Sequence, residues 1–313
     1  MGKIAFIFPG QGSQTVGMGK EWAQKDEKVA AVFRQADERL QVSLSQLIFE
    51  GPQDVLTKTE NAQPALLTTS IAFLQKVKEA GIAPHYVAGH SLGEYSALVA
   101  ASVLSFFDAV YAVRKRGELM EKAVPSGQGT MAAVLGMDEA LLQQVVDEAS
   151  TESSPVQLAN LNCPGQIVIS GAKEAVERAS QLAKEKGAKR VIPLEVSGPF
   201  HSILMKPAAE QFLSVLDTLA FQESAVPVIS NVTAEPMVDP TEMKQRLVEQ
   251  LYSPVRWEQS VQTMIDLGVD TFIEIGPGKV LSGLVKKINR HVNVYSIFDE
   301  ASFIATVAAV KGE

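Results

Sequence analysis

The chain has 313 residues, of which 46% are hydrophobic, and its 28 basic and 36 acidic side chains give a net charge of −8. This length is enough for one large domain or two smaller ones with a sizeable core. The acidic balance argues against nonspecific binding to nucleic acid. No stretch approaches the roughly 18 consecutive apolar residues that a membrane-spanning helix needs.

Cysteine content and the N-terminal segment indicate where the protein works. Cys163 is the single cysteine, so the chain cannot form an internal disulfide, which is typical of a reducing compartment. The apolar run at 4–8 ends in Pro-Gly and is too short for a signal peptide. We therefore expect a cytoplasmic monomer with no nucleic-acid or membrane partner. No His/Cys cluster has metal-ligand spacing, so we expect no metal and no other cofactor.

The first predicted strand, residues 3–8, leads into a glycine-rich loop, Pro-Gly-Gln-Gly-Ser-Gln at 9–14. This loop lacks the third glycine of a dinucleotide fingerprint and the Gly-Lys-Ser/Thr ending of a phosphate-binding loop. We interpret it as a segment that exposes the backbone N–H of Gln11. A simple tight turn is the alternative.

A predicted helix at 63–80 precedes a second strand at 86–89, and Gly-His-Ser-Leu-Gly follows at 89–93. The pattern G-x-S-x-G between a strand and a helix is typical of a nucleophile elbow, which raises a serine above the sheet edge. The flanking glycines allow strand and helix to pass close to the turn. Ser91 is therefore the candidate nucleophile. The alternative is a glycine-rich turn with a capping serine.

The next predicted helix, residues 108–123, carries three consecutive cations, Arg114, Lys115 and Arg116. An arginine aimed into a cleft would bind a carboxylate through paired hydrogen bonds. A solvated helix face is the alternative.

The middle of the chain follows a different order of elements. After a connector at 125–129, the pattern predicts strand, helix, two strands, helix and strand, which is the split βαβ or ferredoxin-like unit. These elements are expected at 130–135, 138–150, 156–161, 166–170, 172–186 and 190–196.

Outside this segment, apolar runs alternate with helical patterns, as in a parallel sheet with crossover helices. The further elements are expected at 205–219, 226–230 and 271–275. We therefore predict an α/β fold: a hydrolase-like parallel-sheet domain (residues 1–126 and 198–313) with an inserted ferredoxin-like subdomain (residues 127–197). A cleft between the two bodies would be the natural ligand site.

A serine nucleophile needs a general base. The chain offers four histidines: His85, His90, His201 and His291. His201 follows the last subdomain strand, where the chain re-enters the large domain at the cleft, and by elimination it is the best base. A loop histidine without a role is the alternative. No acid stands out at a strand end, so a backbone or amide carbonyl would orient the imidazole and make a dyad.

The oxyanion of an acyl-transfer intermediate needs two hydrogen-bond donors. One should be the N–H of Leu92, the residue after the nucleophile, and the other should come from a loop after an early strand. The N–H of Gln11 meets the second condition.

Four segments in the same order resemble the family of malonyl-CoA:acyl-carrier-protein transacylases, and the likeness runs from about residue 3 to residue 290. The segments are Pro-Gly-Gln-Gly-Ser-Gln at 9–14, Gly-His-Ser-Leu-Gly-Glu-Tyr at 89–95, Phe-His-Ser at 200–202 and Glu-Ile-Gly-Pro-Gly at 274–278. The resemblance implies that Ser91 carries the acyl ester, that His201 is its base, and that the amides of Gln11 and Leu92 form the oxyanion hole.

The resemblance also implies four roles in substrate binding. Arg116 matches the arginine that pairs with the malonyl carboxylate, and Gln250 matches the residue whose carbonyl orients the histidine. Asn162 matches a position in the cleft. In related domains a phenylalanine before the histidine goes with malonyl rather than methylmalonyl substrates, and Phe200 fits the malonyl pattern.

The implied activity is transfer of a malonyl group from malonyl-CoA to the phosphopantetheine thiol of acyl carrier protein in fatty acid synthesis. It proceeds through a malonyl-serine ester, and the coenzyme A thioester is a substrate rather than a cofactor. A serine hydrolase such as a thioesterase, or a noncatalytic binding module, are the alternatives. An acidic carrier protein would need a local basic patch. Two clusters qualify: Lys184, Lys186, Lys189 and Arg190, and Lys286, Lys287 and Arg290.

Overall fold

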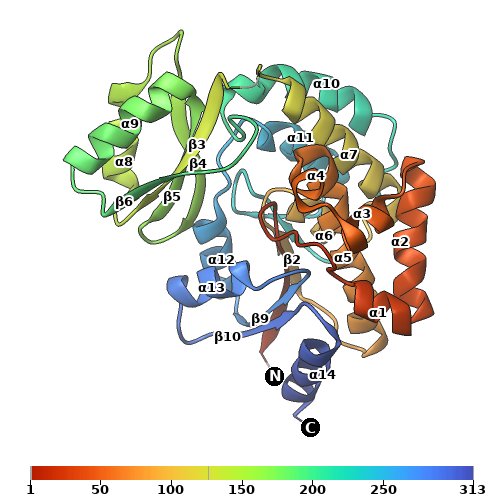
Figure 1. The fold of residues 1–313 in the computed structure, drawn as a ribbon. Helices are drawn as coiled ribbons and strands as arrows, with labels where there is room; N and C mark the ends of the chain where they lie inside the picture. The colour runs from red at the N-terminus through yellow and green to blue at the C-terminus, as the bar shows by residue number, and fades with distance from the viewer. Residues whose placement is uncertain (1, 126, 313) are drawn as a thin grey trace.

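The computed structural model describes residues 2–125 and 127–312 of the chain, and the domain boundary expected at residue 126 lies outside them. Figure 1 shows two bodies: a large one built on a mostly parallel sheet, and a smaller one that carries a separate antiparallel sheet. The mixed α/β architecture expected from the sequence is confirmed. Within the described ranges, no helix is both long and apolar enough to cross a membrane.

The large sheet has the strand order β10-β9-β1-β2-β7-β8. All of its pairings are parallel except that of β7 with the edge strand β8, which is antiparallel. The strands are β1 (Lys3–Phe8), β2 (Tyr86–Gly89), β7 (Val228–Ile229), β8 (Pro236–Met237), β9 (Val269–Ile275) and β10 (Asn293–Ile297).

Helices cover both faces of this sheet (Figure 1). They are α1 (Lys20–Lys25), α2 (Glu27–Leu40), α3 (Leu44–Glu50), α4 (Gln53–Thr57), α5 (Thr59–Glu79), α6 (Gly93–Ala100), α7 (Phe106–Lys122), α10 (Lys206–Leu216), α11 (Pro240–Gln250), α12 (Trp257–Asp266), α13 (Val280–Ile288) and α14 (Glu300–Lys311), with a 3-10 turn at Ile203–Met205 before α10.

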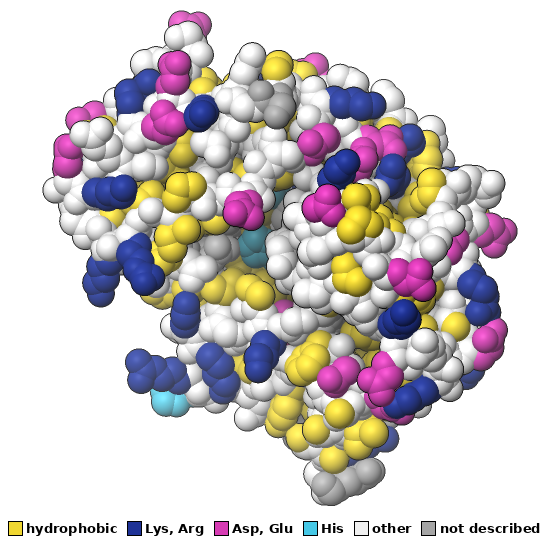
Figure 2. Space-filling view, viewed as in Figure 1, with side chains coloured by type: hydrophobic (Ala, Val, Ile, Leu, Met, Phe, Trp, Pro, Cys, Tyr) yellow, Lys and Arg dark blue, Asp and Glu magenta, His cyan; other side chains and the backbone are white. Residues whose placement is uncertain are grey.

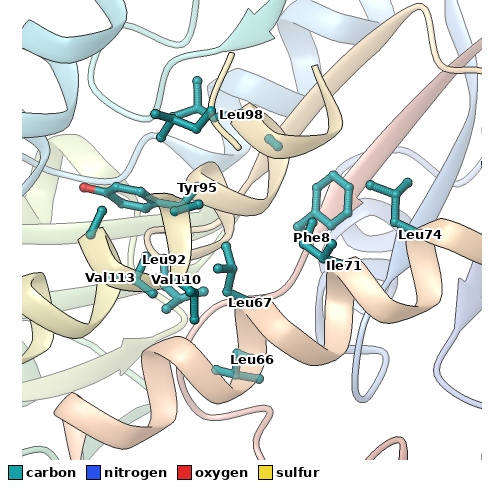
Figure 3. Packing of buried hydrophobic residues seen from close by; sticks show 14 of the residues in the cluster. Phe8, Leu66, Leu67, Ile71, Leu74, Leu92, Tyr95, Leu98, Val110 and Val113 are labelled. Carbon is teal, nitrogen blue, oxygen red and sulfur yellow. The ribbon is translucent and has the colours of Figure 1, made fainter. Parts of the chain in front are cut away.

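Alternate side chains of β1 belong to two different hydrophobic clusters of the large body, one on each face of the sheet. Phe6 and Phe8 pack into the cluster that includes α2, α5, α6, α7 and α10. Ala5 and Ile7 pack on the opposite face against α12 and α13. Because successive side chains of a strand point to opposite faces, a central strand covered on both faces is apolar throughout. Figure 3 shows Phe8 beside Ile71 and Leu74 of α5.

The small sheet has the order β4-β5-β3-β6, and all of its pairings are antiparallel. Two helices pack on this sheet, and the apolar side chains between the helices and the sheet form a separate hydrophobic core for the small body. Its elements follow the order expected from the sequence: β3 (Gly129–Leu135), α8 (Glu139–Ala149), β4 (Val156–Cys163), β5 (Gln166–Ala172), α9 (Lys173–Glu185) and β6 (Arg190–Pro193).

Two predicted strands are shorter than expected. The strand predicted at 190–196 ends at Pro193, although the N–H of Leu194 still donates to the main-chain oxygen of Met131 on β3 over 3.0 Å. The strand predicted at 226–230 covers only Val228–Ile229. After β6 the chain lines the cavity between the two bodies with Leu194, Glu195 and Val196.

The two bodies meet along β4. The N–H of Leu161 donates to the carbonyl of Val255 over 2.9 Å, and the N–H of Val255 donates to the carbonyl of Ala159 over 2.8 Å. These bonds fix the small sheet against the segment that leads into α12. They place it beside the carboxyl ends of β1 and β2, the edge where open α/β sheets bind ligands.

Candidate active site

Ser91 occupies a sharp turn between β2 and α6. Its φ is +51°, a conformation that residues other than glycine rarely adopt. A Cβ on Gly89 would lie 1.9 Å from the carbonyl carbon of Gly93, and a Cβ on Gly93 would lie 2.1 Å from the main-chain oxygen of Phe8. Both positions therefore require glycine. The strained turn holds the serine hydroxyl above the sheet edge.

Ser91 and His201 lie together although 110 residues separate them in the chain. The Oγ of Ser91 is 2.8 Å from Nε2 of His201. On the other side of the ring, Nδ1 lies 2.8 Å from the main-chain oxygen of Gln250. A carbonyl oxygen can only accept, so Nδ1 carries the proton and Nε2 is left to accept the serine proton.

The environment of His201 keeps its imidazole neutral. The pKa of His201 is lowered to about 3, mainly by burial and secondly by the nearby charge of Arg116. At neutral pH the ring therefore has a free lone pair on Nε2. Its backbone also has a positive φ of 58°, and its N–H donates to the carbonyl of Leu251 over 3.1 Å.

Arg116 lies at the same point and is only 1% exposed. Its Nη2 donates to Ser91 Oγ over 3.1 Å and to Gln250 Oε1 over 2.8 Å, and its Nη1 donates to Gln63 Oε1 over 2.7 Å. All three acceptors are uncharged oxygens. Its Nε has no hydrogen-bond partner within the described ranges. Burial lowers the pKa of Arg116 below its ordinary value, and the charge of nearby Glu94 partly opposes that shift. Because the three acceptors are uncharged, a ligand carboxylate here would form a direct ion pair with the buried guanidinium.

The candidate oxyanion donors are two backbone N–H groups. In the part of the chain that the structure describes, neither Gln11 nor Leu92 donates its N–H to another backbone or side-chain group. Gln11 lines the cavity beside Ser91. The side chain of Leu92 points into the core instead and is 1% exposed, which leaves its amide as the group at the N-terminus of α6.

A cavity of about 280 Å³ lies above these groups. Ser91, Arg116 and His201 line it from the large body, whereas Met131 and Leu194 line it from the small one. Figure 2 shows the hollow between the two bodies from outside. Phe200, which directly precedes His201 in the chain, also lines the cavity.

Asn162 takes a different position from the other predicted site residues. Its Oδ1 lies 2.8 Å from Nε2 of His90, and His90 packs against the ring of Trp257 with centroids 5.8 Å apart. Asn160, two residues earlier on β4, lines the cavity. Asn162 thus joins the elbow to the small sheet from behind the cavity wall.

Sequence reasoning missed Asn231, which holds the elbow from both sides. Its Oδ1 accepts from the N–H of Ser91 over 2.7 Å, and its Nδ2 donates to the carbonyl of Gly89 over 2.7 Å. Asn231 lies two residues after the end of β7, at the ligand-binding edge of the sheet. A polar residue directly after the strand predicted at 226–230 was the available signal.

Comparison with known proteins agrees with this arrangement. The family model for the acyl transferase domain matches residues 5–300. The malonyl CoA-acyl carrier protein transacylase of Bacillus subtilis (strain 168) is 61% identical over 313 residues, which are 100% of this chain and 99% of that protein. The chain belongs to the family of malonyl CoA-acyl carrier protein transacylases. It is an acyltransferase.

Other transacylases support the same family. The enzyme of Staphylococcus aureus (strain MRSA252) is 48% identical over 297 residues, covering 95% of this chain and 96% of that protein. The crystal structure of an acyl carrier protein S-malonyltransferase from Vibrio cholerae has a TM-score of 0.95 at 45% identity, covering 97% of this chain and 99% of that one. A malonyl-transacylase solved in complex with a type II PKS acyl-carrier protein has a TM-score of 0.95 at 42% identity, covering 99% and 100%.

Proposed function

We propose that this transacylase moves a malonyl group from malonyl-CoA to the phosphopantetheine thiol of acyl carrier protein, in fatty acid biosynthesis, through a malonyl-serine ester. The observation that carries the proposal is the hydrogen bond between Arg116 Nη2 and Ser91 Oγ. It places a buried cation beside the candidate nucleophile, in one cavity with the candidate base. A short acyl group that ends in a carboxylate suits this pairing.

In the first half-reaction, Ser91 Oγ attacks the thioester carbonyl while Nε2 of His201 takes its proton. The N–H groups of Gln11 and Leu92 stabilise the oxyanion. The tetrahedral intermediate collapses, the C–S bond breaks, and the imidazolium returns its proton to the coenzyme A sulfur. The main-chain oxygen of Gln250 holds the ring in the required tautomer throughout.

The second half-reaction reverses these steps with the carrier-protein thiol as nucleophile. His201 takes the thiol proton, the sulfur attacks the malonyl-serine ester, and Ser91 leaves with the proton returned to its oxygen. Arg116 holds the carboxylate during both halves and so fixes the ester for attack. Phe200 limits the space beside the acyl chain, and Asn162 supports the cavity wall through His90.

We also propose that the fold consists of a hydrolase-like domain and an inserted ferredoxin-like subdomain. The elbow between β2 and α6 supports a hydrolase-like large domain, residues 1–126 and 198–313. The order of helices and strands between 127 and 197 supports a ferredoxin-like inserted subdomain. The proposed enzyme works as a monomer and needs no cofactor, since the coenzyme A thioester is its substrate.

The test is intact-mass measurement after brief mixing with malonyl-CoA and no carrier protein. The variants are Ser91→Ala and, as a matched control, Ser96→Ala, which removes another buried serine hydroxyl from the same helix region. We expect one malonyl adduct on the wild type and on Ser96→Ala, none on Ser91→Ala, and discharge of the adduct by carrier protein.

Two other outcomes would contradict the proposal. Steady release of malonate without an accumulated adduct would indicate a thioesterase, which uses the same serine and histidine with water as the second nucleophile. Neither adduct nor turnover would indicate a binding protein that keeps the fold.

A further inference from the structure

We propose that Glu94 is a positioning residue for acyl selectivity: it fixes the orientation of the side-chain amide of Gln250 and, through that amide, the guanidinium of Arg116. This inference rests on the proposed function. Glu94 lies on the first turn of α6, three residues after Ser91, and is 1% exposed. It lines no part of the cavity described above, so any effect on the acyl group must pass through a neighbour.

That neighbour is Gln250, whose side chain bridges Glu94 and Arg116. Its Nε2 donates to Glu94 Oε2 over 2.6 Å and to the main-chain oxygen of Ser91 over 3.0 Å. Its Oε1 accepts from Arg116 Nη2 over 2.8 Å. One amide thus connects a carboxylate on one side with a guanidinium on the other.

The direction of this amide is decided by chemistry rather than by shape. An ionised carboxylate only accepts hydrogen bonds, and a guanidinium only donates them. Gln250 must therefore turn its NH₂ toward Glu94 and its oxygen toward Arg116. A flipped amide would place NH₂ against NH₂ at Arg116 and oxygen against oxygen at Glu94, and both bonds would be lost.

Glu94 is itself held from the opposite side. Its Oε2 also accepts from the N–H of Asn231 over 3.3 Å, and Asn231 in turn binds the N–H of Ser91. Within the described ranges Oε1 of Glu94 has no hydrogen-bond partner. A buried carboxylate with so few donors is costly to keep, and a well-packed core at this position has no need of one. The donor direction imposed on Gln250 gives a reason for the charge.

The inference predicts a loss of selectivity rather than a general loss of activity. In Glu94→Met the NH₂ of Gln250 loses its shortest hydrogen bond and keeps the one to the main-chain oxygen of Ser91, so the amide and the Arg116 fork that it holds are less firmly positioned. In Glu94→Gln an amide oxygen can still accept from Gln250 Nε2, but a neutral acceptor makes a weaker bond than a carboxylate. We expect the loss in Glu94→Gln to lie between the wild type and Glu94→Met.

The experiment compares kcat and KM for malonyl-CoA and acetyl-CoA in the holo carrier-protein assay. For Glu94→Met we expect kcat/KM to fall roughly tenfold with malonyl-CoA, mainly through KM, and about threefold or less with acetyl-CoA. The matched control is Glu274→Gln, which alters another buried glutamate. Glu274 accepts from the N–H groups of Leu281 and Ser282 at the start of α13, away from the cavity, so its change should leave the malonyl-to-acetyl ratio as in the wild type.

Equal losses with both substrates in Glu94→Met would overturn the inference, since a purely structural role predicts them. A wild type that transfers malonyl groups while both Glu94 variants keep its selectivity would also overturn it and leave the proposed function intact. A wild type that transfers no malonyl group would overturn both.

A pH profile decides the question if Glu94→Met does not fold. Burial raises the pKa of Glu94 to about 7, and the titratable groups that face it are Arg116 on α7 and Tyr95 on its own helix. Protonation removes the charge that strengthens the hydrogen bond from Gln250 Nε2 and so loosens the amide and the Arg116 fork that it holds. We expect the wild-type malonyl-to-acetyl ratio to fall as the pH drops from 8 to 6, and the Glu94→Gln ratio to stay constant. Parallel profiles would overturn the inference.

Discussion

The imidazole of His201 donates from Nδ1 to the main-chain oxygen of Gln250, with 2.8 Å between the two atoms. A peptide carbonyl thus takes the place that a carboxylate has in a Ser-His-Asp triad. It fixes the tautomer without adding a negative charge that would stabilise the imidazolium. The side chain of Gln250 remains available for a second task, the bond to Arg116.

Replacement of Arg116 tests the binding of the acyl carboxylate. We expect Arg116→Ala to lower kcat/KM for malonyl-CoA about ten- to hundredfold more than for acetyl-CoA, because a charge-assisted pair contributes about 1.5–3 kcal/mol. Arg116→Lys keeps the charge but not the fork and should fall between. Arg114→Ala is the control on the same helix, since Arg114 binds Glu118 and Asn61 instead. Equal losses with both acyl groups would contradict the carboxylate role.

Part of this site could be predicted from the sequence, because its signals lie within short stretches of the chain. The elbow around Ser91 can be recognised from the sequence because the two glycines that it requires, Gly89 and Gly93, lie within the same five residues. His201 followed by elimination among four histidines. Its distance of 2.8 Å from Ser91 Oγ agrees with that reasoning.

The partners of these residues had no such local signal. Gln250 lies at the end of α11 and Asn231 follows a strand of only two residues, and both reach the elbow from more than 130 residues away. Periodicity reports which face of an element is buried, not which polar group meets it. Resemblance to the family indicated Gln250, whereas Asn231 and Glu94 became visible only in three dimensions. The cytoplasmic location stays a prediction.

The pH dependence of acyl transfer should reflect a neutral His201. Because burial and the charge of Arg116 lower its pKa to about 3, the ring stays unprotonated as the pH falls from 8 to 5. We therefore expect kcat/KM for acetyl-CoA, which carries no carboxylate, to stay constant over this range. In Arg116→Ala one of the causes that lower the pKa is removed, so the acid limb should move to higher pH. An acid limb near pH 6.5 in the wild type with acetyl-CoA as substrate would contradict this account.

Gln157 connects the small sheet to the loop of His201. Its Nε2 donates to the main-chain oxygens of His201 and Tyr252, each over 3.3 Å, and its Oε1 accepts from the N–H of Ile203 over 2.8 Å. These bonds hold a backbone with positive φ at His201. Gln157→Ala should therefore misplace the base.

The expected result is a fall of about five- to tenfold in kcat for malonyl-CoA and acetyl-CoA alike, since small misplacements of a base slow both half-reactions. Gln143→Ala, on the outer helix of the small body, is the control, because Gln143 binds only Asp147 among the described residues. A change of the malonyl-to-acetyl ratio in Gln157→Ala would show that it acts on substrate binding instead.

The docking of an acidic carrier protein is expected to use exposed cations beside the cavity. In Figure 2 Lys and Arg side chains gather around the hollow, over the β6 and α13 regions. In the first cluster, Lys186 is paired with Glu148 over 2.5 Å. In the second, Lys286, Lys287 and Arg290 are exposed, and Lys287 reaches the uncharged Oε1 of Gln166 on the small sheet over 3.1 Å.

We therefore expect charge reversal at the second cluster to have the larger effect. Lys287→Glu should raise the carrier-protein KM severalfold and leave the malonyl-CoA KM unchanged, and added salt should reduce the difference from the wild type, because exposed charges are screened beyond about 10 Å at 0.1 M salt. Lys186→Glu is the matched comparison, and its effect should be smaller, since Glu148 already pairs with the charge of Lys186 in the wild type. An unchanged carrier-protein KM in both variants would reject electrostatic docking at either cluster, and equal shifts in the two substrates' KM values would indicate damage to the cavity rather than to a docking surface.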